Sequence, residues 1–160
     1  MKFLIVLLVL GVAGYVVYDR QQSLNPADIE SPVYAELRMD ARIQGRDLNM
    51  VLFGEMASQE DCQERANRAW QKLIDGCQEC TMKLASCAVE LAPRYQRLFD
   101  DAKIQSTYLS FTRGSRFERN GRMVVYGLTS DEGDAVCQSI MAEFQKRYEG
   151  KVSCIHGRRD

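Results

Sequence analysis

One sequence phrase occurs twice in the chain, and it constrains the fold more than any other feature. The copies read MVLFGEMAS at residues 50–58 and MVVYGLTS at residues 123–130. Each runs from an apolar segment through a glycine to a serine, a residue that favours the start of a helix. Each following helix begins its apolar stripe with a cysteine, Cys62 or Cys137, and ends at a glycine 14 or 13 residues later. The economical interpretation is two tandem units, and chance similarity between short strands is the alternative.

Hydrophobic periodicity gives each unit the order strand, strand, helix, strand. From residue 33 to residue 43 the odd positions are all apolar and the even ones mostly charged, which predicts a strand with one buried face. The first unit, residues 33–91, adds strands at 48–56 and 81–91 and a helix from Ser58 to Gly76. The second unit, residues 106–156, has strands at 106–117, 123–128 and 152–155, an Asn-Gly hairpin turn at 119–122 and a helix from Ser130 to Gly150. A short helix at 93–101 joins them.

These elements predict an α+β fold. Two tandem ββαβ-like units would form a ferredoxin-like sandwich, with helices packed on an antiparallel sheet. The domain is expected to cover residues 33–160, after one N-terminal membrane helix.

An uncharged run at residues 3–18 precedes the domain. As a helix it would be about 24 Å long, slightly short for a bilayer core of about 30 Å but longer than most signal-peptide cores. We expect residues 1–20 to be a single-pass inner-membrane anchor and residues 21–32, polar with two prolines, to be a linker. The alternative is a signal peptide cleaved near Ala13. In the first case the domain faces the periplasm, and in the second it is released as a periplasmic or secreted protein.

Six cysteines are expected to form structural disulfides. The correspondence between the units pairs Cys62 with Cys87 and Cys137 with Cys154, each joining a helix start to the following strand. Cys77 and Cys80 would then bond to each other, one of 15 possible connectivities. Closing loops of this length contributes about 3 kcal/mol each and requires an oxidising compartment.

The sequence gives less support to two other roles for these cysteines. Cys77-x-x-Cys80 has the spacing of a redox motif, but it follows a helix end beside Glu79, where the thiol pKa should rise and not fall. A zinc site built from Cys62, Cys77, Cys80 and Cys87 would need two closely spaced pairs, and only one is present. We therefore expect neither a metal nor a cofactor, and keep a thiol–disulfide redox protein as a second alternative.

The remaining candidate binding residues are basic. Arg113, Arg116, Arg119 and Arg122 recur every three residues and could grip an anionic lipid surface, a glycan or an acidic partner. The alternative is a solvated hairpin whose charges prevent edge-to-edge aggregation. His156, the single histidine, is expected to be an exposed tail residue. The net charge of −1 gives no reason to expect nucleic-acid binding, and no catalytic motif is present.

The segments VLFGEMASQE and VVYGLTSDE share the order strand, glycine, serine, glutamate, helix. This order resembles the sporulation-related repeat (SPOR) domains, which bind peptidoglycan and are commonly carried by bitopic proteins of bacterial envelopes. The resemblance implies a SPOR-like fold and binding of glycan strands. The chain differs in its additional hairpin strands, its six cysteines and a cysteine where the family usually has alanine. We therefore expect a non-enzymatic, membrane-anchored binding or scaffold module of the cell envelope, acting on an unidentified envelope protein or glycan, with peptidoglycan binding as the alternative.

Overall fold

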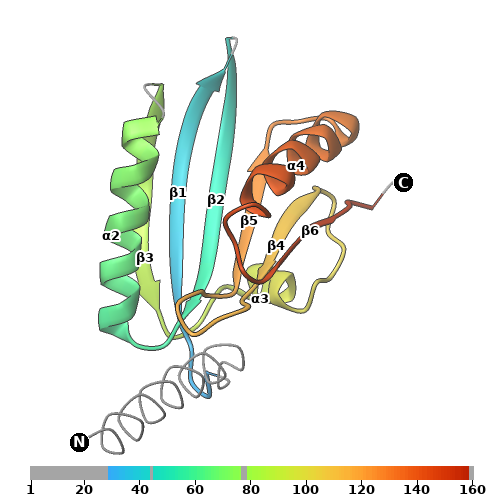
Figure 1. Cartoon of the computed structure of the whole chain (residues 1–160). Helices are drawn as coiled ribbons and strands as arrows, with labels where there is room; N and C mark the ends of the chain where they lie inside the picture. The colour runs from blue at the N-terminus through green and yellow to red at the C-terminus, as the bar shows by residue number, and fades with distance from the viewer. Residues whose placement is uncertain (1–28, 44, 77–78, 159–160) are drawn as a thin grey trace, which may run out of the picture.

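The computed structural model describes residues 29–43, 45–76 and 79–158 (Figure 1). The expected anchor at residues 1–20 and most of the linker lie outside these ranges. Within them, no helix is long and apolar enough to cross a membrane.

The described residues form one antiparallel sheet of six strands with three helices, so the α+β class is confirmed. The sheet order is β3-β1-β2-β5-β4-β6. The elements in chain order are β1 (Val33–Ile43), β2 (Arg46–Met56), α2 (Gln59–Gly76), β3 (Cys80–Ala88), α3 (Pro93–Phe99), β4 (Tyr108–Thr112), β5 (Gly121–Tyr126), α4 (Ser130–Phe144) and β6 (Lys151–Ile155).

The two halves of the sheet meet at a single strand pair. In the first half β1 pairs with both β2 and β3, and in the second half β4 pairs with both β5 and β6. The pairing of β2 with β5 joins the halves at the centre. Each half is therefore a three-stranded sheet whose first strand lies in the middle.

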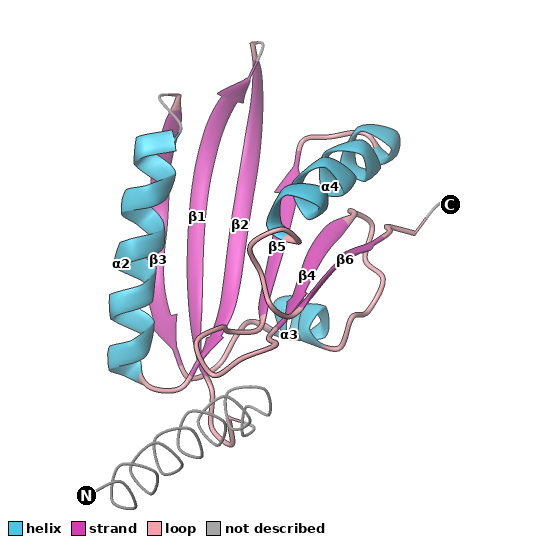
Figure 2. Cartoon of the chain, viewed as in Figure 1, coloured by secondary structure: helices cyan, strands magenta, loops and turns pink. Residues whose placement is uncertain are grey.

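The helices divide between the two faces of the sheet. On one face α2 packs on β1 and β3, and α4 packs on β4 and β6, so the two helices cover opposite ends of the sheet (Figure 2). On the other face α3 closes a core made of Val51, Phe53, Tyr95, Leu98, Tyr108 and Val124. The buried face expected for residues 33–43 is confirmed by Val33, Ala35, Leu37, Met39 and Ala41, and Tyr34 on the other face is buried as well.

Both expected helix-to-strand disulfides are present. Cys62 bonds to Cys87 with 6.1 Å between the Cα atoms, and Cys137 bonds to Cys154 with 5.9 Å. Each joins a helix to an edge strand, α2 to β3 and α4 to β6. Cys80 is also disulfide-bonded, but its expected partner Cys77 lies outside the described residues.

The expected hairpin is confirmed, since β4 and β5 are consecutive antiparallel strands, but the position expected for its turn, residues 119–122, is wrong. Residues 113–120 form a loop, and Gly121 is already in β5, paired with Phe111 of β4. The Asn120 side chain accepts a hydrogen bond from the Arg113 amide (3.0 Å) and donates one to Glu55 (2.7 Å). Gly121 is needed for close packing within the sheet, because a Cβ there would lie 3.1 Å from the Phe53 carbonyl oxygen.

The predicted capping residue of α2 is confirmed, and that of α4 is corrected. The Ser58 hydroxyl accepts a hydrogen bond from the Asp61 amide (3.1 Å) at the start of α2. In α4 the capping residue is Thr129 and not Ser130, because Thr129 and Glu132 form a reciprocal capping box. The helix also ends earlier than expected, at Phe144, and Gly150 instead packs against the Thr112 carbonyl oxygen.

Replacing the α4 cap tests this correction. The Thr129→Ala variant should lose about 1 kcal/mol of unfolding free energy, because two hydrogen bonds at the helix start are removed. The matched control is Ser130→Ala, which should change stability by less than about 0.5 kcal/mol. Urea unfolding followed by circular dichroism measures both, and a larger loss at Ser130 would contradict the assignment.

Candidate functional site

An apolar groove runs between α2 and α4 on the face of the sheet that both helices share. The helices stand over opposite ends of that face (Figure 1). The groove has a volume of about 400 Å³. Its floor carries Leu37, Met39, Met50, Leu52, Met56 and Met123, and its walls carry Ala66 and Ala69 of α2 and Ile140 and Phe144 of α4.

Small residues deepen one part of the floor. Gly54 of β2 pairs with Ala35 of β1 on one side and with Gly121 of β5 on the other. This row across three strands therefore carries almost no side-chain volume. A Cβ at Gly54 would lie 2.6 Å from the methyl carbon of Met56, so the glycine leaves room for that side chain.

The floor is also rich in methionine. Four methionines, Met39, Met50, Met56 and Met123, line the groove beside the leucines. Unbranched thioether side chains adapt to ligands of different shape and are over-represented at adaptable binding surfaces. At the rim, Phe144 is 45% exposed. An apolar concave surface of this kind is a candidate ligand site.

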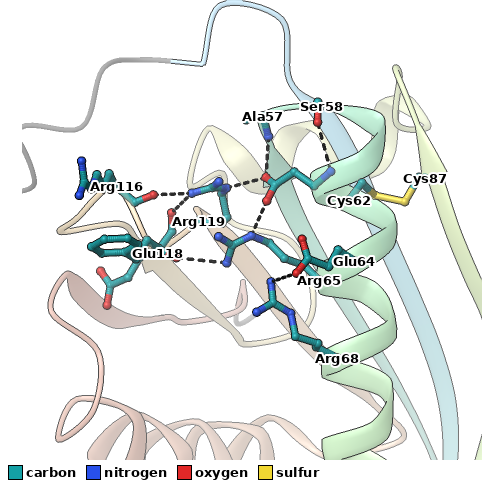
Figure 3. Close-up of polar contacts among 12 residues, drawn as sticks. Ala57, Ser58, Cys62, Glu64, Arg65, Arg68, Cys87, Arg116, Glu118 and Arg119 are labelled. Carbon is teal, nitrogen blue, oxygen red and sulfur yellow. Dashed lines mark hydrogen bonds and ion pairs between the residues drawn. A yellow bond between two sulfur atoms is a disulfide. The ribbon is translucent and has the colours of Figure 1, made fainter.

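Two arginines border one end of the groove. Arg65 of α2 and Arg119 of the 113–120 loop both line it, and both bind Asp61. The Nε of Arg65 lies 2.6 Å from Asp61 Oδ1, and the Nε of Arg119 lies 2.8 Å from Asp61 Oδ2. Figure 3 shows the two guanidinium groups converging from the helix and the loop. This arginine pair with its shared aspartate carries a net charge of +1.

The same cluster fixes the loop against the start of α2. Arg119 Nη1 donates to the carbonyl oxygens of Arg116 (2.7 Å) and Glu118 (2.8 Å), and Arg65 Nη1 donates to that of Phe117 (3.1 Å). The side chains of Asp61, Arg119 and Arg65 are 17%, 16% and 28% exposed. The arginines are therefore held in place and still reachable.

Asp61 is ionised at neutral pH. Burial by itself would raise the pKa of Asp61. Hydrogen bonds from Arg119, from the Ala57 amide and from Arg65 outweigh that effect and lower the pKa to about 2. The aspartate therefore keeps its charge, and the cluster keeps its net positive charge, throughout the physiological range.

The structure does not bring the four expected arginines together on one surface. Arg119 lies at the groove. Arg122 is buried on the opposite face, where it donates to the Leu98 carbonyl oxygen (2.7 Å) and pairs with Asp101 (2.9 Å), tying α3 to the sheet. Arg116 lies over the Phe117 ring, 4.8 Å from its centroid. Arg113 donates its backbone amide to Asn120. A spacing of three residues aligns side chains only in a helix, and this segment is a loop followed by a strand.

Other expected positions are placed away from the groove. His156 is half-exposed, and its Nδ1 lies 2.9 Å from Asp134 Oδ1, so the residue rests on the start of α4. Across the described ranges, no group of three or more His, Cys, Asp or Glu side chains is arranged to hold a metal ion. The two mapped disulfides bear on the groove indirectly, because each fixes one of its walls to the sheet.

Sequence reasoning missed the groove and Arg65. A signal was available in the alternation of β1, where one face carries only Ala, Leu, Met, Val and Ile over eleven residues. The sequence shows the length of that apolar face. It does not show how much of the face the two helices cover, because that depends on where they pack.

Comparisons of the chain with protein-family models, with curated proteins and with solved structures found no match. The function is therefore inferred from the groove's own residues.

The Asp61 cluster gives the protein a specific acid dependence. Because the pKa of Asp61 is about 2 in the folded chain and 3.8 in its reference state, ionised Asp61 stabilises the fold above about pH 4. That contribution is lost as the pH falls through about 2. The shift corresponds to about 2 kcal/mol.

We expect Asp61→Asn to lower the unfolding free energy by about 2 kcal/mol at pH 7 and by much less at pH 2. Urea titrations at pH 7, 4 and 2 measure the difference. Glu64→Gln is the control, since it removes an exposed carboxylate from the same helix. A pH-independent difference between wild type and Asp61→Asn would contradict the coupling.

Proposed function

We propose that the chain is a non-enzymatic binding module of the bacterial cell envelope, anchored in the inner membrane and exposed to the periplasm, whose ligand site is the groove between α2 and α4. The observation that carries the proposal is the concave surface of about 400 Å³ with an almost wholly apolar lining. Small-molecule sites in proteins have volumes of about 300–1,000 Å³ and a similar character, with a few polar groups at fixed positions.

The cysteines support the extracytoplasmic location. Two disulfides join helices to edge strands, and persistent structural disulfides form in oxidising compartments. The uncharged run at residues 3–18 supports an anchor, or a cleaved signal peptide that would release the domain. Both topologies expose the groove outside the cytoplasm.

We also propose that the two halves are copies of one ββαβ unit. The strand orders β3-β1-β2 and β6-β4-β5 are equivalent, and each half has a disulfide between its helix and its last strand. The copies differ in detail. Gly54 lies within β2, whereas its counterpart Gly127 lies after β5 with a φ of +91°. In this arrangement the groove lies where the two copies meet.

Peptidoglycan binding remains the alternative. It is supported by the two phrases that resemble SPOR domains, each of which does connect a strand to a helix, β2 to α2 and β5 to α4. The groove favours an apolar ligand over a glycan, because a glycan needs many hydrogen-bonding partners and the polar side chains lining the groove are Arg65, Arg119, Asn120 and Tyr148. Co-sedimentation with purified sacculi separates the proposals, since the glycan-binding alternative requires the protein to pellet and the apolar-ligand proposal does not.

A tryptophan in the groove wall should block binding. Ala69 lies on the α2 wall, and Ala69→Trp should weaken binding of the neutral apolar dye N-phenyl-1-naphthylamine at least tenfold, measured by fluorescence titration of the full chain. A tenfold change corresponds to about 1.4 kcal/mol.

The matched control is Asn67→Trp, which places the same side chain at an exposed position of the same helix and should leave dye binding unchanged. Residues 3–18 add the same background to all three proteins. Equal dye affinity in the Ala69→Trp and wild-type proteins would show that the groove is not the site.

A further inference from the structure

We infer that the ligand of the groove is a long-chain fatty acid, whose carboxylate binds between Arg65 and Arg119 and whose hydrocarbon chain lies along the methionine-rich floor. This assignment rests on the proposed function and adds the chemical class of the ligand.

The charge at the groove end matches a single carboxylate. Arg65 and Arg119 together carry two positive charges, and Asp61 neutralises one of them through contacts of 2.6 and 2.8 Å. The remaining charge of +1 is balanced by one singly charged anion. A carboxylate provides that balance, and a charge-assisted hydrogen bond to a guanidinium is about twice as strong as a neutral one.

Donors remain for such an anion. A guanidinium group has five N–H donors, and the recorded hydrogen bonds of both arginines use only Nε and Nη1. We assign the Nη2 groups of Arg65 and Arg119 to the anion, because the contacts given above engage Nε and Nη1. The shared aspartate fixes both side chains, so little conformational entropy is lost when an anion binds.

The floor next to this charged end fits a narrow hydrocarbon chain. The row of Ala35, Gly54 and Gly121 crosses the sheet there, since Arg119 and Asn120 directly precede Gly121 in the sequence. From this row the floor continues along β2 toward Met50, a distance of about 13 Å at roughly 3.3 Å per residue. A ligand that enters along this line has its polar group at the arginines and its chain on apolar side chains.

The groove is too small for a helix from a partner protein to lie inside it. An α-helix with its side chains is about 10–12 Å wide, so three turns occupy a volume on the order of 1,000 Å³ or more. The groove offers about 400 Å³. A helix would therefore place only one face in the groove, whereas a single acyl chain is small enough for a volume of this size.

Displacement of the dye from the full-length protein tests the assignment. Saturated fatty acids of increasing length and the corresponding alcohols are titrated as competitors at concentrations below micelle formation. Palmitate should displace the dye at concentrations at least tenfold lower than hexadecanol. Among the fatty acids, each added methylene should raise affinity about fourfold until the floor is covered.

Single substitutions locate the head group. Arg65→Gln should weaken palmitate binding at least tenfold more than it weakens hexadecanol binding, because only palmitate carries the carboxylate that the guanidinium group binds. Arg65→Lys keeps the charge and should retain at least part of the preference for palmitate. Arg68→Gln is the matched control, because Arg68 is an exposed arginine of the same helix that pairs with Glu64. This variant should leave the affinities for palmitate and for hexadecanol unchanged. Circular dichroism verifies that each variant is folded.

Three results would overturn the assignment. Equal affinity for palmitate and hexadecanol would remove the carboxylate site, as would equal losses for both ligands in Arg65→Gln. Displacement of the dye by an amphipathic helical peptide at lower concentrations than by palmitate would assign the groove to a protein partner. In these cases dye binding in the groove still stands, whereas absence of dye binding from the wild-type protein would remove the proposed function as well.

Discussion

The pairing of β2 with β5 is the interaction on which the rest of the structure depends. It runs from Asn49 opposite Tyr126 to Gly54 opposite Gly121, and it is the strand pairing that joins the two three-stranded halves. It also sets the shape of both faces. On one side it places Val51 against Val124 in the core beneath α3. On the other side it places Leu52 against Met123 on the floor of the groove. The site and the core are thus opposite sides of the same strand pair.

The groove follows from the way the halves are joined. Each helix covers the outer strands of its own half, because the disulfides draw α2 toward β3 and α4 toward β6. Joining the halves through β2 and β5 places the inner strands between the two helices, where the groove lies. Leu37, Met39 and Met56 on the floor are already buried, whereas Met50, Leu52 and Met123 are only partly buried. Burial of apolar area stabilises by roughly 25 cal/mol per Å², so a ligand that covers these partly buried side chains adds to the stability of the fold.

The sequence specified local features more fully than the site. The β1 strand, the Ser58 cap and the pairing of Cys62 with Cys87 and Cys137 with Cys154 follow from patterns within short segments or from comparison of the two halves. The hairpin of β4 and β5 was predicted, but its turn was placed at residues 119–122 and not over residues 113–120, because Asn120-Gly121 is a strong turn signal. Its actual role depends on Glu55 and Phe53, which are distant in the sequence. The four arginines were expected to act together for a similar reason, since the spacing was visible but the crossing of Arg122 to the opposite face was not. The groove depends on three-dimensional packing of both helices, so no local pattern reports it.

The disulfides have a further consequence for how the molecule opens. The edge strands β3 and β6 have a neighbour on one side only, and the end strands of a sheet are ordinarily the first to detach in local fluctuations. Here each is bonded covalently to the helix above it, through Cys87 and Cys154. An edge strand can leave the sheet fully only if its helix moves with it, which couples its opening to that of its whole half. We expect each edge strand to open together with its helix and not alone.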